Sequence, residues 1–174
     1  NNTFTNEFES VRDKLILELL FGTGIRLNEL LQLKTNDVYL SEKTLKVLGK
    51  RNKERIIPIN TALIEILKSY TSIIKNLNFE TSTEKLIVTN KGKPAYPKLI
   101  YRIVNKYLSL ITTQDKKSPH ILRHTFATSL LNKGADINAI KDLLGHANLA
   151  ATQVYTHNSI ERLKLIYKQA HPKA

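Results

Sequence analysis

The sequence contains no cysteine, no methionine and no tryptophan among its 174 residues. The absence of cysteine excludes disulfide bonds and thiolate chemistry, and it fits a reducing cytosol. No apolar run approaches the roughly 18 residues needed to span a bilayer, and the first residues lack the charged and then apolar layout of a signal peptide. These absences favour a cytoplasmic protein. Because an unprocessed chain starts with methionine and this one starts with Asn1, we expect it to be part of a longer protein.

Charge is strongly unbalanced. Lysine and arginine number 27 against 15 acidic residues, which gives a net charge of +12. Such a surplus favours a polyanionic partner, most simply nucleic acid, although a basic protein without such a partner is the alternative. A membrane surface is disfavoured, because no segment pairs a basic face with tryptophan or phenylalanine on the other. Hydrophobic residues make up 41% of the chain, which is enough for one folded domain.

Apolar spacing predicts a mainly helical fold. Residues 6–20 show helical periodicity, Gly22 and Gly24 interrupt it, and a short helix resumes over 27–33. Later helices are expected over residues 61–75 with Thr61 as the cap, from Pro97, over 120–133 after Ser118-Pro119, from Asp136 to Gly145, and over 150–157 and 159–169.

Between the early helices, the pattern changes to short strands. Residues 38–40, 44–48 and 55–59 have the composition of short strands, and polar turns join them. The turn at 49–53 is the most basic of these, and 86–88 is a further possible strand. The sequence therefore predicts an α+β fold, mainly α with a small antiparallel three-stranded β-sheet, in one domain.

The sequence lacks the usual signatures of metal- or nucleotide-dependent chemistry. There is no glycine-rich phosphate loop and no acidic cluster that would hold Mg²⁺. His120 and His124 have the spacing of a zinc pair, but Arg123 lies between them and no glutamate follows the first histidine. We therefore expect no metal and no other cofactor.

What remains is a set of cationic side chains: Arg26, Lys50, His120, Arg123 and His146. Two arginines, a lysine and two histidines suit the task of holding a phosphodiester and its developing charge. Any one of them alone would be read as an ordinary surface or core residue.

Three blocks give these residues a common meaning: TGIRLNELLQL, VLGKRNKERIIPI and HILRHTFATSLLNKGADINAIKDLLGHANLAATQVYTH, in that order over residues 23–157. In sequence, spacing and order, they resemble the catalytic domain of tyrosine site-specific recombinases of the phage-integrase and Xer kind. The resemblance implies that Tyr155 attacks the scissile phosphate of double-stranded DNA and forms a 3′-phosphotyrosyl bond. It also implies that this chemistry needs neither ATP nor metal.

The same resemblance implies roles for the cations. Arg26 and Arg123 would clamp the non-bridging oxygens, and Lys50 would act as general acid toward the leaving 5′-oxygen. His120 would take the tyrosine proton or bind the phosphate, and His146 would donate to the same phosphate. Two further expectations are that Glu29 orients the cationic site from behind and that three cations near Lys50 bind DNA, namely Arg51, Lys53 and Arg55.

The resemblance also implies an organisation for the whole protein. Residues 1–174 would be the catalytic domain, without the N-terminal DNA-binding domain of such proteins. The tail at 159–174 carries apolar residues on one face. It would dock on a neighbouring protomer in a homo- or hetero-tetramer on nucleoid DNA, although packing on its own domain is the alternative. The isolated fragment would be monomeric.

Several alternatives stay open on sequence alone. A DNA-binding protein with a degenerate site is disfavoured by the intact set of six catalytic positions, and a type IB topoisomerase by the LLGH block and the tail. Within the recombinases, chromosome-dimer resolution and integration of a mobile element use the same domain. The compact blocks, without insertions, are more typical of Xer proteins.

Overall fold

The computed structural model of the chain describes residues 2–79, 83–109 and 118–145, with side chains from Asn6 onward. The helices expected over 150–157 and 159–169, and the tail at 159–174, lie outside these residues. In chain order the elements are α1 (Asn2–Thr23), α2 (Leu27–Gln32), the 3-10 turn η1 (Thr35–Asp37), β1 (Val38–Tyr39), β2 (Thr44–Leu48), the 3-10 turn η2 (Lys50–Asn52), β3 (Glu54–Pro58), α3 (Thr61–Leu77), α4 (Pro97–Leu108), α5 (Pro119–Asn132) and α6 (Ile137–Leu144). The expected mainly helical architecture with a small antiparallel sheet is confirmed.

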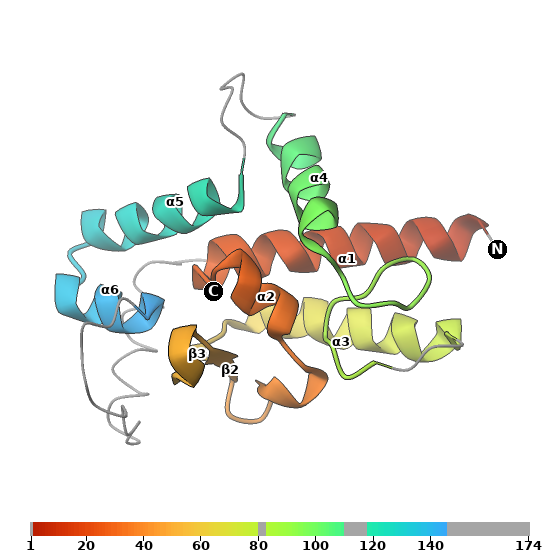
Figure 1. Ribbon diagram of the computed structural model, residues 1–174, viewed down its shortest axis with the longest axis horizontal. Helices are drawn as coiled ribbons and strands as arrows, with labels where there is room; N and C mark the ends of the chain where they lie inside the picture. Colours follow the sequence, from red (N-terminus) through yellow and green to blue (C-terminus); the bar gives the residue numbers. More distant parts are fainter. Residues whose placement is uncertain (1, 80–82, 110–117, 146–174) are drawn as a thin grey trace.

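Helix α1 is the central element of the core. It runs along the long axis of the molecule, with α3 and α5 packed against it (Figure 1). Four of its side chains, Leu15, Ile16, Leu19 and Leu20, have no exposed surface. Burial of each stabilises the fold by about 1.5–3 kcal/mol relative to an exposed position. Among the described helices, none combines the length and the apolar character that crossing a bilayer requires.

The sheet has the order β1-β2-β3, with both neighbouring pairs antiparallel. Leu45 pairs with Ile57 and Val47 pairs with Arg55. Because side chains alternate across a strand, these four residues lie on one face, and all four are buried. The register therefore turns Arg55 inward, toward the end of the molecule where β3 meets α6.

The turn between α1 and α2 depends on Gly24. The expected interruption at Gly22 is wrong, because α1 continues through it to Thr23. Gly24 has φ +66°, and a Cβ atom there would lie 2.4 Å from the Phe126 ring and 2.7 Å from Leu144. Only glycine meets both requirements without strain. The close approach brings the turn before α2 against Phe126 of α5 and Leu144 of α6, which positions the site described below.

Two other local expectations differ from the structure. Asn60, and not Thr61, caps α3, because the Asn60 side chain accepts a hydrogen bond of 2.7 Å from the backbone N–H of Leu63. The segment 86–88 forms no strand, and the isolated bridges there are made by Lys85, just before it, and by Val88. Its apolar residues are buried against the core all the same, so their burial does not depend on strand pairing.

Candidate active site

Arg26 sits at the N-cap of α2, directly after the turn at Gly24 and Ile25. Its backbone N–H donates to Glu29 Oε2 at 2.7 Å, and its Nη1 donates to Glu29 Oε1 at 3.1 Å. Glu29 thus satisfies an amide that the helix leaves without a partner and holds the arginine side chain as well. The Arg26 side chain is 28% exposed, whereas that of Glu29 is 4% exposed.

Arg55 reaches the same carboxylate from β3. Its Nη1 and Nη2 donate to Glu29 Oε1 and Oε2 at 2.7 and 3.0 Å, and its Nε donates to the carbonyl of Leu143 at 2.8 Å. The side chain is only 5% exposed. The guanidinium of Arg55, which the sequence analysis expects to contact DNA, is buried between a carboxylate and the end of α6.

Arg123 approaches the site from α5. Its Nη1 donates to the carbonyl of Gly24, and its Nη2 donates to that of Leu144 at 2.7 Å. The residue is 9% exposed. The turn that requires glycine therefore also supplies an acceptor that orients the Arg123 fork.

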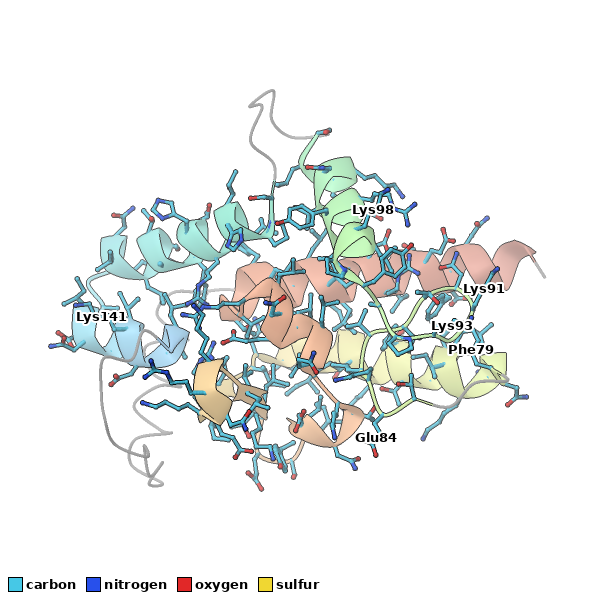
Figure 2. The ribbon with its side chains drawn as sticks, in the orientation of Figure 1. Phe79, Glu84, Lys91, Lys93, Lys98 and Lys141 are labelled. Atoms are coloured by element: carbon cyan, nitrogen blue, oxygen red, sulfur yellow. The ribbon has the colours of Figure 1, made fainter. Side chains whose placement is uncertain are left out.

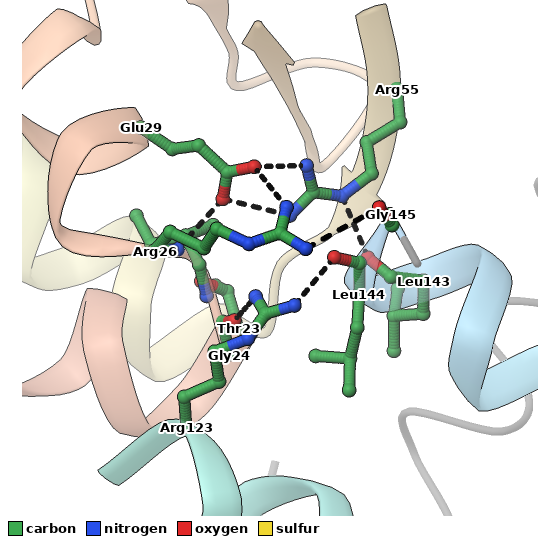
Figure 3. A network of polar contacts seen from close by, with 10 residues as sticks. Thr23, Gly24, Arg26, Glu29, Arg55, Arg123, Leu143, Leu144 and Gly145 are labelled. Carbon is green, nitrogen blue, oxygen red and sulfur yellow. Dashed lines mark hydrogen bonds and ion pairs between the residues drawn. The ribbon is translucent and has the colours of Figure 1, made fainter. Parts of the chain in front are cut away.

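The C-terminal end of α6 is where the arginines converge. The last carbonyls of a helix lack intrahelical partners and carry partial negative charge, so cations stabilise them. Three successive carbonyls here each accept from an arginine of a different element, as Figure 3 shows. The pairs are Leu143 with Arg55, Leu144 with Arg123, and Gly145 with Arg26, the last at 3.4 Å.

The network of Arg26, Glu29, Arg55 and Arg123 has an excess of positive charge. Burial raises the pKa of Glu29, but the hydrogen bonds and charges of Arg55 and Arg26 outweigh burial and hold the pKa below its ordinary 4.5. Burial and the neighbouring charge of Arg26 lower the pKa of Arg123 to about 10. Three guanidinium groups thus lie near one carboxylate, which accepts hydrogen bonds from Arg26 and Arg55, and an anion beside them would relieve the repulsion between Arg26 and Arg123.

The remaining expected site residues lie outside this network or outside the described residues. Lys50, with Arg51 and Lys53, is exposed at the β2–β3 turn, where Arg51 has φ +57°. His120 is exposed in the first turn of α5, one helical turn before Arg123. His146 and Tyr155 lie outside the described residues.

Surface lysines alone would not locate this site. Figure 2 shows Lys141 on α6 at one end of the molecule and Lys91 and Lys93 at the other. Like Lys98 on α4, all of these are exposed. The distinguishing feature of the site is the convergence of three arginines from different elements on Glu29 and the C-terminal end of α6. Within the part of the chain that the structure describes, no three histidine, cysteine or acidic side chains are grouped to hold a metal ion.

One site feature that was missed, the inward position of Arg55, does have a sequence signal. Arg55 shares its parity with Ile57 and Ile59 along the strand, and both isoleucines are buried. Alternation therefore places Arg55 on the core face. The basic character of the neighbouring turn obscured this signal.

Comparison with known proteins places the chain among recombinases. The phage integrase family matches residues 1–162. The chain is 42% identical over 173 residues to the tyrosine recombinase XerC of Chlorobaculum parvum. This match covers 97% of the chain and 52% of that protein. It is 40% identical over 164 residues to the tyrosine recombinase XerD of Staphylococcus saprophyticus, a match that covers 94% of the chain and 56% of that protein.

Solved structures agree. The XerA recombinase superposes with a TM-score of 0.71 and 35% identity, covering 99% of this chain and 61% of that one. The XerH site-specific recombinase, solved in a pre-cleavage complex with its difH substrate, gives a TM-score of 0.71 and 28% identity, covering 96% and 51%. The chain thus spans about half the length of the curated relatives it matches.

Proposed function

The chain belongs to the phage integrase family of tyrosine recombinases, and on that premise we propose that it cleaves and rejoins DNA strands at a specific site. The observation that carries this proposal is the cluster of three arginines beside the buried Glu29 carboxylate, in which Arg55 and Arg123 are buried and Arg26 is partly exposed. Such a cluster has positive charge to spare for an anion, and the fork of an arginine matches two oxygens of a phosphate.

In the proposed reaction, the Tyr155 oxygen attacks the scissile phosphorus and forms a 3′-phosphotyrosyl bond, and the bond to the 5′-oxygen breaks. His120 accepts the tyrosine proton, and Lys50 protonates the leaving 5′-oxygen. Tyrosine has an ordinary pKa near 10, so it needs such a base and a positive field at neutral pH. Attack by a 5′-hydroxyl on the phosphotyrosine reverses the step and rejoins the strand.

Arg26 and Arg123 would stabilise the charge that develops on the non-bridging oxygens, with His146 as a further donor. Their value lies in preorganisation, since Glu29 and the carbonyls around them hold the guanidinium groups in place before DNA arrives. Because the covalent intermediate conserves the energy of the phosphodiester, the cycle requires neither ATP nor metal.

The finer assignment is an Xer-like recombinase that acts on bacterial DNA in the cytoplasm as a homo- or hetero-tetramer, with integration of a mobile element as the related role. The similarity to XerC and XerD over nearly the whole chain supports it. In this proposal the exposed turn of Lys50, Arg51 and Lys53 contacts the duplex beside the cleaved bond. The tail at 159–174 docks on the neighbouring protomer.

The assignment of Tyr155 is tested with a nicked suicide substrate, which traps the covalent intermediate. Tyr155→Phe retains the ring and loses only the nucleophilic oxygen. We expect it to form no covalent adduct on a denaturing gel while its DNA affinity stays nearly unchanged. A shifted protein–DNA band from the phenylalanine variant would exclude Tyr155 as the nucleophile. Relaxation of supercoiled plasmid without a cognate site would indicate a topoisomerase instead.

A further inference from the structure

The Glu29 carboxylate is shared unequally between two arginines. Arg55 binds both of its oxygens in a fork, at 2.7 and 3.0 Å, whereas the Arg26 side chain makes one bond of 3.1 Å to Oε1 (Figure 3). Paired two-point contacts of this kind are the stronger form of arginine–carboxylate interaction. Arg55 is therefore the main partner of Glu29, and Arg26 is the secondary one.

The two arginines also differ in access to the surface. The Arg55 side chain is 5% exposed, and its Nε donates to the carbonyl of Leu143. A Cβ atom on Gly145 would lie 3.0 Å from Arg55 Nη1, so the backbone of Gly145 packs on the guanidinium. Arg26 is partly exposed. Of the two, Arg26 can reach a DNA phosphate and Arg55 cannot.

We propose that Arg55 is a positioning residue, which occupies the Glu29 carboxylate and thereby keeps Arg26 available for the DNA phosphate. This inference rests on the proposed function. A buried carboxylate strongly requires a cationic partner. Without Arg55, the nearest cation is Arg26, whose Nη1 already lies 3.1 Å from Oε1. Glu29 would then draw Arg26 into a fork of its own and neutralise it.

A purely structural role for Arg55 makes a different prediction. If Arg55 serves only to hold the end of α6 through Leu143, its loss would slow cleavage whatever residue stands at position 29. If instead Glu29 captures Arg26 when Arg55 is absent, removing the charge at position 29 restores the reaction. The two explanations therefore separate in a double variant.

The experiment compares Arg55→Met, Glu29→Gln and the double variant in single-turnover cleavage of a suicide substrate, at saturating protein and per folded molecule. Loss of a preorganised phosphate donor costs about 10²-fold in rate, and we expect this loss for Arg55→Met. We expect the double variant to regain at least about tenfold of it, up to the rate of Glu29→Gln. A double variant as slow as Arg55→Met, or slower, would overturn the proposal.

A matched control comes from the buried Arg12, which is as little exposed as Arg55 and pairs with Asp13 away from the site. Arg12→Met removes a buried guanidinium in the same way, and we expect no change in cleavage per folded molecule. If Arg55→Met does not fold, Arg55→Lys serves in its place. A lysine makes one contact and not a fork, so the loss is smaller, and Glu29→Gln should again reverse it.

A second readout does not depend on DNA cleavage. Phenylglyoxal modifies accessible arginines, and peptide mass spectrometry follows the modification of Arg26. We expect Arg26 to react more slowly in Arg55→Met, where Glu29 holds it, and to recover in the double variant. An unchanged or faster reaction in Arg55→Met would contradict the capture of Arg26. If the parent protein forms no DNA adduct, the proposed function fails, and this measurement still decides the role of Arg55.

Discussion

Two buried arginine–carboxylate pairs lie in different parts of this small molecule. Arg12 and Asp13 are neighbours in α1, whereas Arg55 and Glu29 are 26 residues apart and join β3 to α2. All four residues are 4% exposed. Burial and pairing are thus the same in both places, and neither property alone separates a structural pair from a functional one.

The surroundings of the two pairs differ. Arg12 also donates to Asn90 and lies over the Phe8 ring, and Asp13 has Lys106 at 4.0 Å. These contacts tie α1 to the loop at Asn90 and to α4, with charge nearly balanced. The Arg55–Glu29 pair instead adjoins Arg26 and Arg123, and the latter has a pKa lowered to about 10 by burial and by Arg26. The two pairs therefore differ in the balance of charge around them and not in burial, and the proposed function assigns the excess of positive charge to the binding of a DNA phosphate.

The largest effect is expected when the Arg12–Asp13 pair is broken. Arg12→Met leaves Asp13 buried with only the distant Lys106, and removing one partner of a buried pair costs about 3–5 kcal/mol. We expect a decrease in the free energy of unfolding at the lower end of this range, measured by urea denaturation. Cleavage by the folded fraction stays at the parent rate. A specific loss of cleavage would show that the two regions are coupled.

A slightly smaller effect is expected when Arg123, in the network around Glu29, is replaced. Arg123→Lys keeps the charge that sets DNA affinity but loses the fork, so we expect cleavage to fall by about 10²-fold. That loss corresponds to about 2.7 kcal/mol in the barrier. Arg12→Lys is the matched control and should cleave like the parent. Parent-like cleavage by Arg123→Lys would exclude Arg123 from the phosphate clamp.

The pairing of Glu29 also predicts how the stability of the protein depends on pH. The folded protein holds the pKa of Glu29 below its ordinary 4.5, so the unfolded chain binds more protons just below that pH. The stability from Glu29 is fully present above pH 4.5 and is lost as pH falls through the folded value. We expect Glu29→Gln to lack this part of the acid destabilisation, seen as a flatter dependence of Tm on pH between about 6 and 3. Parallel curves for the two proteins would contradict the pairing.

The smallest expected effect is none. Because the cations of the chain itself would balance the phosphate charge, we expect EDTA to leave the cleavage rate unchanged in the parent and in Arg12→Lys alike. The measurement is adduct formation with and without chelator. Complete inhibition, reversed by added Mg²⁺, would point to a metal-dependent nuclease and remove the functional meaning of the arginine excess.

Much of the fold follows from local pattern. Apolar spacing predicted α1 and α2, proline and capping signals predicted the helices after Pro97 and Ser118-Pro119, and short runs between polar turns predicted the three strands. Two expectations about single residues are wrong. Gly22 does not interrupt α1, and Asn60, not Thr61, caps α3. Such choices depend on the backbone conformation of single residues, which the apolar pattern does not specify.

By itself, the sequence determined the kinds of element, the family and the supply of cations that the family's chemistry uses. Only the tertiary structure decided how those cations are divided. Arg55 and Arg51 stand in the same basic segment, yet one is buried on Glu29 and the other is exposed. The physical reason is the separation along the chain of the residues that interact. Helical and strand periods are set by residues a few positions apart, whereas the contact of Arg26 with Gly145 spans 119 residues. That contact depends on the close approach of the turn at Gly24 to Phe126 of α5 and Leu144 of α6.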